Sequence, residues 1–130
     1  MESEGTAVRS IYYGRIGSEA TERLLERFGC DGSFLLRDSE TVAGAYCLCV
    51  RKAPFVHTYR LVHVPEGWYL QRDLLVKFGT LEALIEHYRS GRVPHVGIVP
   101  LTDPLYKTQI PNSFHHELVY MELSSSSFAQ

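Results

Sequence analysis

The chain lacks most features that would assign it to an extracellular, membrane-spanning or nucleic-acid-binding class. Its 130 residues include three cysteines, an odd number, and Cys47 and Cys49 fall on one face of a single predicted strand. That pattern supports neither a disulfide framework nor a zinc site, so reduced thiols are expected. A formal net charge of −2 excludes a polyanion binder driven by bulk charge, so any phosphate site must be local.

Signals for membrane insertion and for catalysis are also missing. No apolar run approaches the roughly 18 residues of a membrane span, and the first ten residues are acidic and polar, unlike a signal peptide. The six histidines lack the spacing of a helical zinc pair, and neither a glycine-rich phosphate loop nor a nucleophile elbow occurs. We therefore expect a cytoplasmic, non-enzymatic chain with no metal, no cofactor and no nucleic-acid partner.

What the chain does contain is the composition of one globular domain, with 45% hydrophobic and 22% charged residues. Capping signals at Ser18 and Thr80 and a glycine stop at Gly29 predict two helices. The predicted helices span 19–28 and 80–88, and the predicted strands span 33–37, 46–51, 56–64, 67–71 and 97–99. This order predicts an α+β fold, with a central antiparallel sheet flanked by two α-helices.

The apolar pattern fades beyond about Pro104, and a run of four serines follows at 124–127. The sequence therefore predicts a short N-terminal segment over 1–10, a folded domain over 11–104 and a flexible C-terminal tail over 105–130.

An arginine at the end of a predicted buried strand is the strongest functional signal. Phe34–Leu36 form an apolar run typical of a strand that is covered on both faces, and Arg37 ends it. An arginine there needs an anion, and its fork binds a phosphate through two parallel hydrogen bonds. Directly after it, 39–41 offer hydroxyls and turn amides for the same oxygens. The alternative is an ion pair with Asp38 or Glu40.

Three separated motifs resemble the Src-homology-2 (SH2) domain. They are Ile11–Ile16, Gly32–Glu40 and Phe78–Tyr88, and with Leu101–Pro104 they span about 95 residues in the order of that family. Within the family, the chain is most similar to the SLAM-associated protein family of single-SH2 adaptors at 35–40, 46–50 and 58–60. At 43–45 and 56–60 it is also similar to the SH2 domains of inositol 5-phosphatases, which are the alternative subfamily.

The resemblance implies a monomeric adaptor that binds tyrosine-phosphorylated tails of immune-type receptors through a Thr-x-Tyr-x-x-Val or Ile motif and couples them to intracellular signalling. The residues that it implies for the phosphotyrosine site are Arg37, Ser39, Glu40, Thr41, Cys47, Thr58 and Arg60. For peptide specificity it implies Tyr59, Leu74, Leu75, Val96 and Ile98, with the segments 72–76 and 90–99 as pocket-forming loops. A phosphate-independent peptide-binding module is a further alternative.

At two positions the chain differs from the usual SH2 pattern, and two of its tyrosines are candidate phosphorylation sites. Ser18 stands where the family usually has a basic residue, so we expect a weaker phosphate contribution. Gly79 stands where the best-known relative uses an arginine to recruit a kinase, which puts that mechanism in doubt. Tyr120 and Tyr106 are candidate phosphorylation sites through which kinases or other SH2 proteins could bind. At Tyr120 a role and no role are equally supported, and at Tyr106 packing is favoured.

Overall fold

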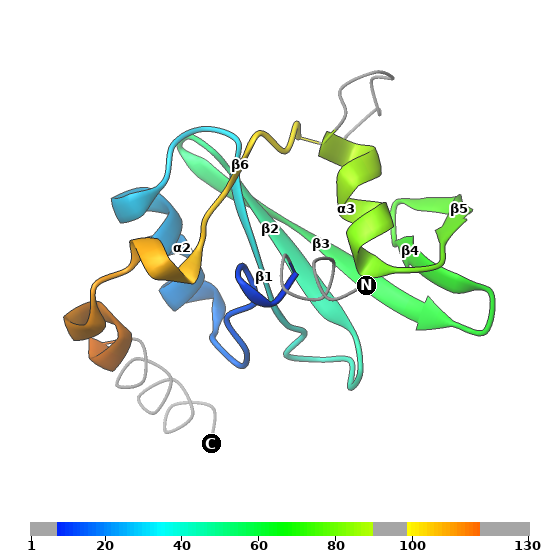
Figure 1. The fold of residues 1–130 in the computed structure, drawn as a ribbon, viewed down its shortest axis with the longest axis horizontal. Helices are drawn as coiled ribbons and strands as arrows, with labels where there is room; N and C mark the ends of the chain where they lie inside the picture. Colours follow the sequence, from blue (N-terminus) through cyan, green and yellow to red (C-terminus); the bar gives the residue numbers. More distant parts are fainter. Residues whose placement is uncertain (1–7, 90–98, 118–130) are drawn as a thin grey trace.

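The computed structural model describes residues 8–89 and 99–117 and shows a sheet between two helices (Figure 1). The helices are α2 (Ser18–Phe28) and α3 (Leu81–Arg89). The strands are β1 (Ser33–Asp38), β2 (Tyr46–Lys52), β3 (Phe55–Val64), β4 (Gly67–Leu70), β5 (Asp73–Phe78) and β6 (Asp103–Pro104). Their order is β5-β4-β3-β2-β1-β6, antiparallel from β1 to β5, with β6 parallel to β1. The predicted α+β fold with its antiparallel meander is confirmed.

Each face of the sheet buries its own hydrophobic cluster against one helix. On one face, side chains of α2 pack on alternate residues of β1 and β2, including Leu35, Cys47 and Cys49. On the other face, α3 packs on Phe34, Leu36 and their neighbours in β2, β3 and β4. Because successive side chains of a strand point to opposite faces, β1 is buried on both sides, as its unbroken apolar run predicted.

The outer edge of β1 is covered by two short segments from opposite ends of the chain. One segment runs beside its far end, where Tyr13 donates its backbone N–H to Leu36 and Asp38 donates to Gly14. The other contains β6 and continues to Leu105, which donates to the carbonyl of Phe34 at 2.9 Å. Backbone groups that would otherwise be exposed at a sheet edge are thereby paired, and β1 is held in a fixed position.

Two local predictions are wrong, each for an identifiable reason. Ser18 does not cap α2, because the helix begins at Ser18 itself and extended Gly17 is the N-cap residue. Instead, Thr21 donates its hydroxyl to the carbonyl of Gly17 at 2.8 Å. The segment 72–76 is not a loop, because most of it belongs to β5, which pairs with β4. Pro104 lies in an edge strand, where a missing N–H is tolerated.

The first part of the predicted tail is packed on the domain, so the boundary drawn at 105 is too early. Leu105, Ile110 and Phe114 are 2%, 5% and 4% exposed and belong to the cluster beneath α2. The ring of Phe114 meets Phe28 edge-to-face at 5.0 Å between centroids. Figure 1 shows this segment, in orange, lying beside α2. Residues 118–130 lie outside the described structure.

The second predicted helix starts as expected, since the hydroxyl of Thr80 accepts the N–H of Ala83 at 3.1 Å. Of the predicted closing strand, 97–98 lie outside the described residues, and Val99 belongs to no strand. Among the helices of the described part of the chain, none has both the length and the apolar character needed to span a membrane.

Candidate functional site

Strand register aligns the predicted phosphate-binding side chains in a row across three strands. Arg37 of β1 lies opposite Cys47 of β2, and Cys47 lies opposite Arg60 of β3. Cross-strand partners point to the same face of a sheet, with Cβ atoms about 4.5–5.5 Å apart. The two arginines therefore flank one cysteine on the face that is packed against α2.

A second row lies one step along the same face and forms the apolar side of the site. Cys49 of β2 lies between Leu35 of β1 and Thr58 of β3. Thr58 directs its hydroxyl to the sulfur of Cys49 at 3.8 Å. Burial raises the pKa of the Cys49 thiol to about 11, while the nearby guanidinium of Arg37 acts in the opposite direction. This thiol is therefore neutral and inert at ordinary pH.

Arg37 is buried and only partly satisfied. It is 4% exposed, its Nη1 donates to the backbone carbonyl of Asp38 at 3.2 Å, and its Nε has no hydrogen-bond partner within the described residues. Its charged neighbour is Glu40, with 3.7 Å between Nη1 and Oε1, and that carboxylate side chain is 58% exposed. Because water screens the exposed Glu40 carboxylate, it compensates the charge of Arg37 only weakly. A buried cation with an open donor calls for an anionic ligand.

The carboxylate of Asp38 is held by another residue. The hydroxyl of Tyr12 donates to Asp38 Oδ1 at 2.6 Å, and this bond is the main reason that the pKa of Tyr12 rises to about 12. The contact joins residues 26 positions apart, and sequence reasoning missed it. The ion pair between Arg37 and Asp38, which the sequence left open, is not formed.

Arg60 closes the site from the other side through the loop that follows β1. Its Nη2 donates to the hydroxyl of Thr41 at 3.0 Å, and its buried Nε has no partner among the described residues. The hydroxyl of Ser39 accepts the backbone N–H groups of Thr41 at 3.3 Å and of Val42 at 3.1 Å. This turn places the three loop residues predicted from sequence beside the two arginines.

The start of α2 contributes no cation, in line with the departure seen in the sequence. Ser18 is exposed in the first turn of the helix. Arg15 is also exposed, and its charge acts on Tyr12, where it opposes the rise in pKa. Within the described residues, the cations beside Cys47 are therefore Arg37 and Arg60, while Arg51, further along the same face, donates to the carbonyls of Leu25 and Gly29.

The predicted specificity residues are separated by the structure. Leu74 and Leu75 are 56% and 96% exposed on β5 and can contact a ligand. Tyr59 is buried in the cluster beneath α3, and its hydroxyl accepts the N–H of Val99 at 3.0 Å. Val96, Ile98 and Tyr120 lie outside the described residues. Tyr106 is 42% exposed.

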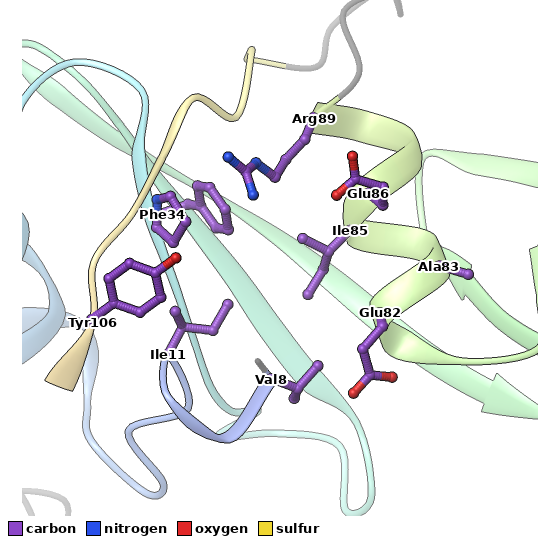
Figure 2. Close-up of a pocket in the computed structure, with 10 residues that line it drawn as sticks. Val8, Ile11, Phe34, Glu82, Ala83, Ile85, Glu86, Arg89 and Tyr106 are labelled. Carbon is purple, nitrogen blue, oxygen red and sulfur yellow. The ribbon is translucent and has the colours of Figure 1, made fainter. Parts of the chain in front are cut away.

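A hollow on the α3 side of the sheet was not anticipated from sequence. It encloses about 420 Å³ between α3, the segment around Ile11 and the segment around Tyr106. Figure 2 shows Phe34, Ile85 and Ile11 at its centre, Arg89 at one end and Glu82 at the other. The guanidinium of Arg89 lies 5.8 Å from the centroid of the Phe34 ring. This hollow lies on the opposite face from the arginine row and has no buried cation.

Gly79, where the resemblance to the SH2 adaptors led us to look for an arginine, lies exposed just before α3. A Cβ built there would meet no atom within 4 Å. A side chain would therefore fit at this position, so the fold does not exclude an arginine here on steric grounds.

Comparison with known families assigns the class of protein. The family described as the SH2 domain matches residues 11–88, which is more than half of the chain and includes Arg37, Arg60, all of α2 and all of α3 except its last residue. The chain therefore belongs to the SH2 domain family and is a phosphotyrosine-binding module.

Two kinds of relative illustrate its place in the family. The chain is 36% identical over 102 residues to human SH2 domain-containing protein 1B, and the match covers 75% of each chain. It is 51% identical over 105 residues to human phosphatidylinositol 3,4,5-trisphosphate 5-phosphatase 2, and 49% identical to the mouse protein of that name. That match covers 73% of this chain, which spans 8% of the phosphatase's length. The similarity to single-SH2 adaptors is confirmed, and the shared part is a binding module.

Proposed function

We propose that the chain is an adaptor that binds tyrosine-phosphorylated Thr-x-Tyr-x-x-Val or Ile motifs in the tails of immune-type receptors and couples them to intracellular signalling. The observation that carries the proposal is the row of Arg37, Cys47 and Arg60, in which the Nε of each arginine is buried and has no partner among the described residues. The site is local, as the net charge of −2 requires.

In this proposal the phosphate oxygens displace weak contacts and gain strong ones. A tyrosyl phosphate carries a charge of about −1.5 to −2 and accepts several charge-assisted hydrogen bonds. Arg37 supplies a bidentate fork from β1, and Arg60 supplies the second cation from β3. The loop 39–41 then offers its hydroxyls and backbone N–H groups to the remaining oxygens. The exposed carboxylate of Glu40, 3.7 Å from Arg37, gives way to the phosphate.

Residues on either side of the phosphotyrosine meet different parts of the sheet. Over 55–59 the edge of β3 has no partner strand on the β4 side among the described residues, since pairing with β4 begins at Leu61. That edge can accept the peptide before the tyrosine as an added strand. Exposed Leu74 and Leu75 of β5 offer apolar surface to an aliphatic residue after the tyrosine.

A second candidate keeps the same phosphate chemistry and changes the peptide. Identity of 51% to the 5-phosphatase segment favours an SH2 domain with the ligand preference of that subfamily. A third candidate, phosphate-independent peptide binding, gains weak support from Ser18 and is opposed by the buried Nε atoms of Arg37 and Arg60. Side-by-side titrations separate the three.

The test is calorimetric titration of the chain with a Thr-x-Tyr-x-x-Val peptide, phosphorylated and unphosphorylated. We expect binding that requires the phosphate and that falls by at least about 100-fold in Arg37→Ala, since a buried charge-assisted contact is lost. Arg23→Ala is the matched control, because Arg23 carries the same charge on the exposed face of α2, where its side chain is 59% exposed.

Each contrary result points to one alternative. Equal binding of the two peptides, unaffected by Arg37→Ala, would indicate the phosphate-independent module. Phosphate-dependent binding that prefers other flanking residues would indicate the 5-phosphatase-like subfamily. Thermal melts of each variant ensure that a loss of binding is not a loss of fold.

A further inference from the structure

The three cysteines of the chain occupy chemically different places. All three are free thiols. Cys30 is exposed, and its sulfur lies 3.5 Å from a carboxylate oxygen of Asp103. Cys49 is fully buried, with a raised pKa. Cys47 is 7% exposed, and it alone of the three lies between two arginines in the strand register.

An independent observation indicates that the position of Cys47 accepts an anion. The neighbouring Arg37 is 4% exposed, and its Nε is unpartnered within the described part of the chain. The Nε of Arg60, on the other side, is also buried and unpartnered there. A small anion that enters between the two arginines therefore arrives beside the sulfur of Cys47.

We infer that Cys47 is a covalent modification site for small anionic electrophiles, and that its modification blocks phosphopeptide binding. The inference rests on the proposed function, because it names a regulator of the same site. A haloacetate ion illustrates the reaction. The thiolate sulfur attacks the methylene carbon, the carbon–sulfur bond forms as the carbon–halogen bond breaks, the halide leaves with the electron pair, and the thiol proton passes to water.

The adduct opposes phosphate binding in two ways. Its carboxylate takes hydrogen bonds from the guanidinium groups that would bind the phosphate. Its added atoms also fill space on a face of the sheet where the cysteine side chain is already 93% buried, so the phosphotyrosine ring has no room beside it. A neutral reagent of equal size would produce an adduct with the same steric effect, but the two arginines would not attract it to Cys47.

The experiment compares iodoacetate with iodoacetamide, which are similar in size and differ in charge. The full native chain is treated with each, and the alkylation rate at each cysteine is followed by peptide mass spectrometry. The same series is run with phenyl phosphate present and in the Arg60→Gln variant. Phosphopeptide binding is then measured for treated and untreated wild type and for Cys47→Ser.

Electrostatic attraction should raise the iodoacetate-to-iodoacetamide rate ratio at Cys47 at least about tenfold above that at Cys30. Arg60→Gln should lower the ratio at Cys47, and phenyl phosphate should slow alkylation there but not at Cys30. Carboxymethylation should reduce phosphopeptide affinity at least about tenfold in wild type and leave Cys47→Ser unaffected, because a bulky anion then occupies the cation pair only in wild type.

Equal rate ratios at Cys47 and Cys30 would overturn the inference. Alkylation of Cys49 as fast as that of Cys47 would also overturn it, because the reaction at Cys47 would then report unfolding of the chain and not access to the folded site. Failure of the proposed function is a separate result: untreated protein would then bind neither phosphopeptide nor phenyl phosphate, whatever the reactivity of Cys47.

Discussion

The hydroxyl of Tyr12 donates to the carboxylate of Asp38 at 2.6 Å, on the face of β1 opposite to the side chain of Arg37. On its own face, Arg37 donates to the backbone carbonyl of Asp38. The bond between Tyr12 and Asp38 therefore ties the N-terminal segment to the end of β1, directly before the loop of the phosphate site.

Removing this hydroxyl should lower the stability of the domain. In Tyr12→Phe the hydrogen bond to Asp38 is lost, and we expect the free energy of unfolding to fall by about 0.5–1.5 kcal/mol, which is the range of one hydrogen bond. Chemical denaturation measures it. In Tyr12→Phe combined with Asp38→Ala the loss should be smaller than the sum of the two single losses, and an additive loss would contradict this account.

Leu75 should contribute to the recognition of an aliphatic residue after the phosphotyrosine. It is 96% exposed on β5, and Leu75→Ser should cost about 1 kcal/mol of peptide binding through lost apolar burial. Phenyl phosphate binding should not change. A peptide with alanine in place of the valine supplies a double-mutant cycle, in which Leu75→Ser should cost nothing further. An equal cost with both peptides would exclude the contact.

Stability should fall at alkaline pH because folding holds protons on tyrosines. Hydrogen bonding to Asp38 raises the pKa of Tyr12 to about 12, and burial raises the pKa values of Tyr13 and Tyr88 further. The unfolded chain releases these protons near pH 10. Above this pH the folded state binds more protons than the unfolded state. The tyrosines therefore make their whole contribution to the free energy of unfolding below about pH 10, and that contribution falls as the pH rises further. Urea titrations from about pH 9 to 12 should show a shallower decline in Tyr13→Phe than in wild type.

Packing of the segment 105–117 should be needed for the stability of the domain. Phe114→Ala removes a ring that is 4% exposed and should cost about 3 kcal/mol of unfolding free energy. The exposed neighbour gives a matched control, and Ser113→Ala should stay within about 0.5 kcal/mol. Chemical denaturation measures both. Equal stability of the two variants would contradict the packing of this segment and favour the flexible tail that the sequence predicted.

The turn between β3 and β4 should tolerate no side chain at Gly67. Its φ is +131°, and a Cβ there would collide with the backbone oxygen of Phe78. Gly67→Ala should therefore cost about 1–3 kcal/mol of unfolding free energy. Gly79→Ala, which would meet no atom within 4 Å, should be neutral or stabilising by about 0.5 kcal/mol. Thermal melts compare the two variants, and equal melting temperatures would contradict this reasoning.

The fold and the role of Arg37 were predictable because both depend on local patterns, above all the apolar run that ends at Arg37. Arg60 followed from the resemblance to the SH2 family, and the strand register that places it beside Cys47 comes from the structure. The partner of Asp38 was not predictable, because it comes from a tyrosine 26 residues away. The packed segment after Pro104 escaped notice because Leu105, Ile110 and Phe114 are few and are separated by mostly polar residues. Exposed Leu74 and Leu75 likewise hid the alternation that would have marked β5.

The row of Arg37, Cys47 and Arg60 makes binding a reporter of how the hairpins are paired. A slip of one residue in either hairpin would turn one arginine to the opposite face of the sheet. A chain with such a slip could keep a compact core and still lose its cation pair. Phosphotyrosine therefore acts as a selective ligand for the correctly registered chain, and it should stabilise that chain against misfolded isomers by a free energy that grows with the logarithm of its concentration.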